Sequence, residues 1–115
     1  MSEQAVVQIQ NDSRATVATI LCREFDFQRT GQFKAELAGA VDSDAKLPLI
    51  LDLTNVGYMP SLTLGALVEL RNRFAKDRRP LTLVGMQPPI VKLMQASGMM
   101  SLFDVRPNVA DAMSA

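Results

Sequence analysis

Histidine is absent from this chain of 115 residues. The imidazole side chain is the usual general base near neutral pH and the commonest protein ligand of metal ions. Catalytic dyads and triads built on histidine are therefore excluded. An enzyme is the least expected class of function, and we expect no cofactor and no metal.

Cysteine is almost absent as well. Cys22 is the only one, so neither an internal disulfide nor a cysteine-rich metal site can form, which is compatible with a reducing compartment. Asp26 and Asp52 are candidates for a pair of carboxylates in acid–base or metal chemistry, but no further ligands accompany them at a telling spacing. The position of Asp26 at a helix start and of Asp52 at a strand end is enough to explain both residues.

The chain also lacks net charge and long apolar runs. Twelve basic residues balance twelve acidic ones. Neither a nucleic-acid surface nor an anionic membrane is indicated as a partner, and a protein partner is expected. No stretch reaches the roughly 18 apolar residues of a membrane span, so we expect no direct membrane insertion. The start, MSEQAVVQIQND, has no basic region followed by an apolar one, which predicts a cytoplasmic protein.

The length and the order of patterns predict one α/β domain over residues 1–115, with a mostly parallel sheet and about four helices. Two apolar runs separated by turn residues indicate an opening antiparallel hairpin. Strands and amphipathic helices then alternate. The expected strands are 6–10, 15–21, 49–53, 81–86 and 102–105, and the expected helices are 26–41, 61–75, one from Pro88 to Gly98, and one after Asn108.

Two local features stay open. Asp26 and Thr30 are both suitable caps for the first helix, and the sequence does not distinguish them. The short basic cluster Lys76–Arg79 is interpreted as a solvated connection rather than a phosphate site, because it lacks glycine.

The junction between the strand 49–53 and the helix opening at Ser61 is the expected site of function, since a helix N-terminus presents free backbone N–H groups and a partial positive charge. A helical wheel directs Thr63, Leu64, Leu67, Leu70 and Phe74 toward the sheet. It places Ser61, Gly65 and Glu69 on an exposed arc with Leu62 at its edge. This arc is a candidate protein-docking face. Leu62 is expected to contact a partner there, next to a small surface formed by Gly65 and Ala66.

The central junction resembles the STAS domain, the fold of bacterial anti-sigma factor antagonists. Its residues LILDLTNVGYM followed by PSLTLGAL lie on the family pattern of an aliphatic strand, a few residues, and Asp-Ser-Ser-Gly-Leu-Gly opening a helix. The segment REFDF before the first helix is similar to the family's Gly-Glu-Leu-Asp-Leu, and LTLVG, MQASGM and the closing residues 109–113 also fit. The similarity extends over nearly the whole chain.

The resemblance implies a regulatory protein that binds an anti-sigma factor, itself a serine kinase, and that Ser61 is the residue phosphorylated. Phosphorylation would break the complex. This sequence departs from the pattern in two places: Pro60 replaces the aspartate before the serine, and Leu62 and Thr63 replace the Ser-Gly after it. The lost carboxylate removes an acceptor and a negative charge beside the hydroxyl.

Three alternatives remain at this point. Ser61 is a candidate helix cap with no regulatory role. The second alternative is an accessory subunit of a membrane transporter or a scaffold in stress signalling, in which no serine is phosphorylated. A small-molecule or nucleotide-binding module is the third class, although no Gly-rich phosphate loop is present.

Overall fold

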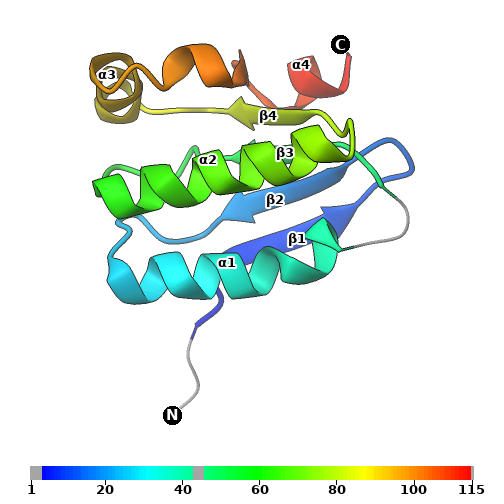
Figure 1. The fold of residues 1–115 in the computed structure, drawn as a ribbon, viewed down its shortest axis with the longest axis horizontal. Coiled ribbons are helices and arrows are strands. Elements are labelled where there is room, and N and C mark those ends of the chain that lie inside the picture. Colours follow the sequence, from blue (N-terminus) through cyan, green and yellow to red (C-terminus); the bar gives the residue numbers. More distant parts are fainter. Residues whose placement is uncertain (1–3, 43–45, 115) are drawn as a thin grey trace.

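The computed structural model describes residues 4–42 and 46–114. Within them the centre of the molecule is a five-stranded sheet with the strands in sequence order (Figure 1). The strands are β1 (Val7–Asn11), β2 (Thr16–Ile20), β3 (Leu49–Asp52), β4 (Leu81–Val84) and β5 (Asp104–Arg106). The helices are α1 (Phe27–Val41), α2 (Ser61–Lys76), α3 (Pro88–Ala96), the 3-10 turn η1 (Met100–Leu102) and α4 (Val109–Met113).

The sheet is mixed, as the sequence predicts. β1 and β2 form the antiparallel hairpin, with Val7 opposite Ile20. β2, β3, β4 and β5 are parallel to one another. Each parallel step contains a crossover, and the α/β class with an opening hairpin and a mostly parallel sheet is confirmed.

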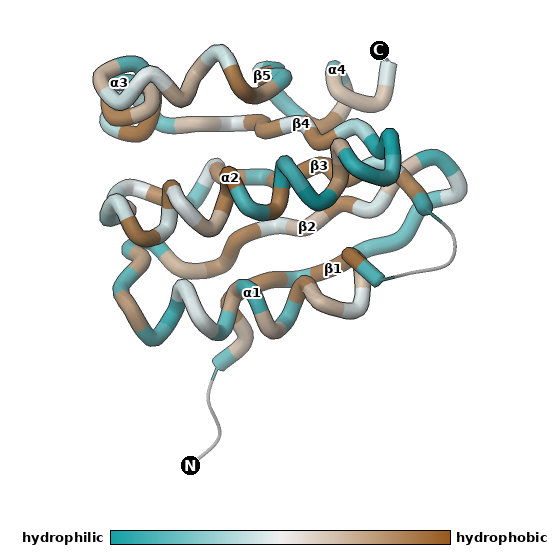
Figure 2. Tube along the Cα trace, viewed as in Figure 1, coloured by the Kyte–Doolittle hydropathy of each residue, from teal (hydrophilic) through white to brown (hydrophobic). Residues whose placement is uncertain are grey.

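Two layers of helices cover the sheet. Figure 1 shows α1 and α2 lying side by side over one face, with α4 at the far end of the chain. The main core lies beneath α1 and α2 and contains Phe33, Leu37, Leu67 and Phe74 among its fully buried side chains. A smaller cluster on the other face joins Ala15, Val17, Ile50 and Val84 to α4. Figure 2 shows the hydrophobic stretches running along the central strands and a hydrophilic end of α2.

The helix starts follow their caps. Asp26 is the cap of α1, because its carboxylate accepts the Arg29 N–H at 2.7 Å, whereas Thr30 lies one turn inside the helix. Asn108 caps α4 in the same way, with the Asp111 N–H at 2.8 Å. Gly98 follows α3 with φ of +74°, the left-handed conformation that ends many helices.

Two expectations need correction. The last strand begins at Asp104 rather than residue 102, because residues 100–102 close a 3-10 turn. The basic cluster is not uniformly solvated: Arg79 is 4% exposed. Its guanidinium donates to the carbonyls of Val41 at 2.8 Å and Ala40 at 3.1 Å, and lies 4.1 Å from the centre of the Phe74 ring. Arg79 therefore satisfies the last carbonyls of α1.

Candidate functional site

The loop from β3 to α2 is held firmly before it reaches Ser61. The Asp52 carboxylate accepts both the N–H and the hydroxyl of Thr54, at 3.0 and 2.5 Å. Asn55 donates its side-chain amide to the Ile20 carbonyl at 3.2 Å. Val56 is fully buried in the core. The start of α2 is thus fixed relative to the sheet.

Ser61 is the first residue of α2, and the cap position belongs to Pro60, which has no side chain that accepts a hydrogen bond. The N–H groups of Thr63 and Leu64 bond to the Pro60 carbonyl at 2.9 and 3.3 Å. Because Ser61 lies inside the helix rather than at its cap, capping does not account for this serine. Its side chain is exposed at the positive end of the helix.

Thr63 lies at the opposite side of the same turn and is 1% exposed. Its hydroxyl is 2.8 Å from that of Thr30 on α1, which in turn donates to the Asp26 carbonyl at 2.7 Å. This chain of hydrogen bonds joins the first turns of the two helices. Of the two hydroxyls in the motif, only that of Ser61 is open to another protein.

The exposed arc of α2 has the expected members. Ser61, Leu62, Gly65 and Glu69 are all exposed, Leu62 by 49% of its surface. Glu69 forms an ion pair with Lys34 of α1 at 3.3 Å. The expectation for Ala66 was wrong. It is 6% exposed and lines the groove between α2 and α1 together with Leu37, so the surface beside Leu62 is formed by Gly65 without it.

Two exposed aromatic residues at the same end of the molecule were not predicted from the sequence. Phe27, the first residue of α1, is 82% exposed, and Tyr58 in the loop before α2 is 55% exposed. The Phe25 N–H donates to the Tyr58 carbonyl at 3.0 Å, which joins the segments before the two helices. Figure 1 shows α1 and α2 starting at one end of the molecule. We call Phe27, Tyr58 and Leu62 the apolar rim of Ser61.

The exposure of Phe27 could have been predicted from the helical periodicity of the sequence. Phe33, Leu37 and Val41 lie on one line of α1, and Phe27, six residues before Phe33, falls about 120° away from that line at ~100° per residue. Its exposure follows from this phase. No comparable pattern exists for Tyr58, because it lies in a loop.

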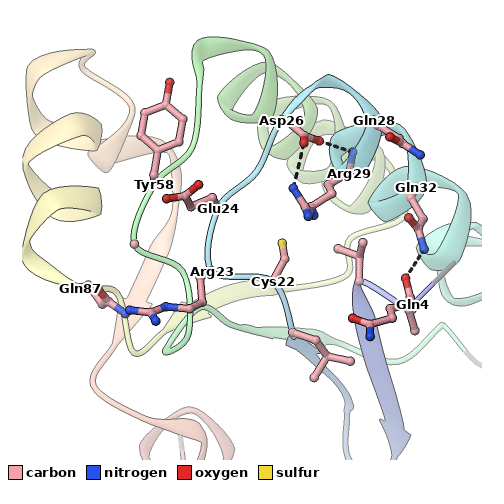
Figure 3. Close-up of a pocket in the computed structure, with 14 residues that line it drawn as sticks. Gln4, Cys22, Arg23, Glu24, Asp26, Gln28, Arg29, Gln32, Tyr58 and Gln87 are labelled. Carbon is pink, nitrogen blue, oxygen red and sulfur yellow. Dashed lines mark hydrogen bonds and ion pairs between the residues drawn. The ribbon is translucent and has the colours of Figure 1, made fainter.

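A cavity of about 1100 Å³ opens beside this end of the sheet, and Cys22 and Arg29 are among the residues that line it (Figure 3). Much of its polar lining is already engaged: Arg29 pairs with Asp26 at 2.8 Å, and Gln32 donates to the Gln4 carbonyl at 2.7 Å. Burial raises the pKa of the Cys22 thiol, which lowers its reactivity. In residues 4–42 and 46–114 no group of three His, Cys, Asp or Glu side chains is arranged to hold a metal ion.

The model of one protein family, the STAS domain, matches residues 8–112 of this chain. The chain belongs to the STAS domain family. STAS domains are regulatory binding proteins rather than enzymes, and the anti-sigma factor antagonists among them have protein partners. None of the helices in the described part of this STAS domain is long and apolar enough to cross a membrane.

Solved structures share the fold. An anti-sigma-factor antagonist (STAS) domain protein from Planctomyces limnophilus has a TM-score of 0.87 at 16% identity, with 97% of this chain and 98% of that chain covered. The phosphorylated form of the Bacillus cell fate determinant SpoIIAA has a TM-score of 0.72 at 17% identity, covering 94% and 96%. The murine anion transporter Slc26a9 has a TM-score of 0.76 at 18% identity, covering 91% of this chain and 18% of that chain.

Proposed function

We propose that this STAS domain is an anti-sigma factor antagonist of the bacterial cytoplasm, that it binds an anti-sigma factor with serine kinase activity, and that phosphorylation of Ser61 controls binding. The observation that carries the proposal is the exposed Ser61 at the first position of α2, at the same end of the molecule as the apolar rim. A kinase needs an accessible hydroxyl, and a protein partner needs exposed apolar side chains near it.

The electrostatics of the site suit a switch. Phosphate adds about 1.5–2 negative charges at pH 7, and the start of a helix stabilises an anion. The fold therefore persists after modification. Around Ser61, however, the partner meets a doubly charged group next to Leu62 and Gly65. The complex is weakened by the cost of burying that charge.

The partner contacts proposed for α2 are Leu62, Gly65 and Glu69. Leu62 supplies apolar area, and Gly65 has open space around it: apart from its chain neighbours and the nearby backbone of α2, no atom lies within 4 Å of the position of a β-carbon. Glu69 forms the polar border, since its ion pair with Lys34 is exposed. This arrangement of an apolar centre and a charged border is typical of protein interfaces.

The second candidate is an accessory STAS domain of a transporter or a stress-signalling scaffold in which Ser61 is not modified. Two observations favour it: the fold matches part of an anion transporter, and Pro60 stands where the antagonist pattern has an aspartate. In this case binding depends on the same arc but no phosphate is added.

The test is a pull-down from native cells with the wild-type chain, Ser61→Asp and a control, Ser13→Asp, whose serine is exposed in the hairpin turn. Capture of a serine kinase of the anti-sigma type by the wild type and Ser13→Asp, but not by Ser61→Asp, supports the first proposal, as does phosphate on Ser61 by mass spectrometry. Equal capture by all three forms, with Ser61 unmodified, contradicts the switch.

A further inference from the structure

The strand β1 forms one edge of the sheet, and its backbone is available there. Leu21 donates its N–H to the Val6 carbonyl at 2.7 Å. Antiparallel pairing alternates from residue to residue, so Val7, Ile9 and Asn11 direct their N–H and C=O groups away from β2. The outward groups thus recur at every second residue along the strand.

Only the first of these outward N–H groups has a partner within the described residues. The Glu36 carboxylate of α1 accepts the Val7 N–H at 2.8 Å, so it closes the beginning of the edge. Beyond Val7 the strand is exposed, and Ile9 keeps 37% of its surface accessible. An unpaired strand edge is a template for another strand.

The two edges of the sheet differ in protection. β5 is three residues long and has an ion pair between Asp104 and Arg106 at 3.2 Å. Charges and short length are the usual means by which edge strands avoid pairing with other chains. β1 has five residues, VQIQN, with neither charge nor proline.

We propose that a second copy of this chain pairs antiparallel with β1 about a twofold axis at Ile9. The strand is complementary to itself in this register. Ile9 lies opposite its own copy on the helix side of the sheet, and Gln8 lies opposite Gln10 of the second copy on the other side, where two amides exchange hydrogen bonds. The outward groups of Ile9 bond across the axis, and the Asn11 N–H bonds to the Val7 carbonyl of the second copy.

The neighbouring side of α1 fits the same arrangement. Gln32 and Glu36 reach the beginning of β1 from this helix, at 2.7 Å to the Gln4 carbonyl and 2.8 Å to the Val7 N–H. Ala35 and Gly39 follow Gln32 at spacings of three and seven residues, which places them on the same side of α1, and both are exposed. Such small residues let the α1 helices of two copies approach closely.

Charge does not oppose the pairing. Two kinds of ionised group face this side of the molecule. The Glu36 carboxylate is occupied by the backbone N–H groups of Val6 and Val7. Arg29, three residues before Gln32 on α1, is neutralised by its ion pair with Asp26 at 2.8 Å. Strand pairing alone buries little surface, and the sides of the two α1 helices add to it. The result is a twofold dimer with one sheet continuous across both copies.

Sedimentation velocity on the full chain tests the proposal over protein concentrations from about 5 µM to about 500 µM, since a dimer is favoured by mass action. We expect the wild type to sediment as a dimer at the upper end. In Ile9→Lys two like charges meet at the axis, and the dissociation constant should rise by about tenfold or more. The matched control is Val105→Lys on β5, where Val105 is 38% exposed, and its dimerisation should be unchanged.

A monomeric wild type at every concentration overturns the proposal, and so does a dimer that Val105→Lys weakens as much as Ile9→Lys. Circular dichroism verifies that both variants fold. If Ile9→Lys does not fold, Ile9→Cys in a Cys22→Ser background replaces it: paired residues at the axis lie about 5.5 Å apart at their α-carbons, within the range of a disulfide. Mild oxidation should give a covalent dimer with Ile9→Cys and not with Val105→Cys, and equal yields overturn the register.

Discussion

The hydroxyls of Thr30 and Thr63 lie 2.8 Å apart in the buried contact between α1 and α2. Thr30 has one hydroxyl proton and donates it to the Asp26 carbonyl at 2.7 Å. Thr63 must therefore be the donor between the two threonines. This buried hydrogen bond joins the first turns of both helices, and Phe27 and Leu62 of the apolar rim lie in the same two turns.

That direction predicts unequal effects of nearly isosteric substitutions. Thr63→Val removes one buried hydrogen bond, at a cost of about 1 kcal/mol in the free energy of unfolding, while Thr30 still donates to Asp26. Thr30→Val leaves the Thr63 hydroxyl proton buried without an acceptor and should cost about 2–3 kcal/mol. Urea denaturation measures both.

The double variant Thr30→Val/Thr63→Val serves as the control, because it removes both polar groups together. It should be more stable than Thr30→Val alone, since no buried donor is left unpaired. If the two single effects simply add, the threonines do not act as a pair and the assigned direction is wrong.

The second prediction concerns Gly85, which follows β4 and contacts the loop before α2. Substituting it should lower the stability of the protein. Its φ is +72°, and a β-carbon built there collides with the Thr54 hydroxyl oxygen and lies 3.2 Å from the Asp52 carboxylate. Gly85→Ala should therefore cost more than the roughly 1–2 kcal/mol of a left-handed residue alone, because the Asp52–Thr54 contact must move. Thermal unfolding measures the loss.

Gly98→Ala is the matched control, with φ of +74° and, apart from its two chain neighbours, no atom within 4 Å of its β-carbon position. It should show only the conformational cost, about 1–2 kcal/mol. Adding Thr54→Ala to Gly85→Ala removes the closest atom and should recover part of the stability. If the two glycine variants lose the same stability, the close contact between Gly85 and Thr54 does not contribute to the cost of Gly85→Ala.

The sequence was sufficient for the order of elements and for the phase of α2, because hydrophobic periodicity depends on the local helix geometry alone. Thr63, Leu64, Leu67, Leu70 and Phe74 are buried as that periodicity predicts. The sequence could not identify the cap of α1, because Asp26 and Thr30 have similar preferences for the cap position. Only the short distance from the Asp26 carboxylate to the Arg29 N–H distinguishes them.

Features that depend on contacts between distant segments were beyond the sequence. Arg79 looked like part of a solvated cluster, but its place under the end of α1 follows from packing of residues more than 30 positions apart. Ala66 looked like exposed small surface until α1 was positioned beside α2. Tyr58 joins the apolar rim because a backbone bond to Phe25 brings its loop there.

Arg79 carries a third prediction. Its guanidinium donates to the carbonyls of Leu47, Val41 and Ala40 and stacks on Phe74, a geometry that a lysine ammonium cannot reproduce. Burial lowers the pKa of this guanidinium, although it remains charged at neutral pH. Arg79→Lys should lower the free energy of unfolding by about 1.5–3 kcal/mol in urea denaturation.

The control for Arg79→Lys is the same substitution at the neighbouring position, Arg78→Lys, where the arginine side chain is exposed. This change should leave the free energy of unfolding within about 0.5 kcal/mol of the wild type. Similar small effects for both variants would mean that the Arg79 contacts are replaced by water without loss.

The apolar rim gives the last prediction. Phe27 and Leu62 are exposed by 82% and 49%, so Phe27→Ala and Leu62→Ala should change the free energy of unfolding by less than about 0.5 kcal/mol. The few side chains that anchor the centre of an interface cost about 1–2 kcal/mol or more when they are truncated, and we expect Phe27 and Leu62 to be such anchors. Each variant should therefore weaken binding of the captured partner by about tenfold, as measured by calorimetry with purified proteins. Val105→Ala, on the far edge of the sheet, is the control and should bind as the wild type does. Full-strength binding by both rim variants would move the docking face away from the start of α2, whatever the state of Ser61.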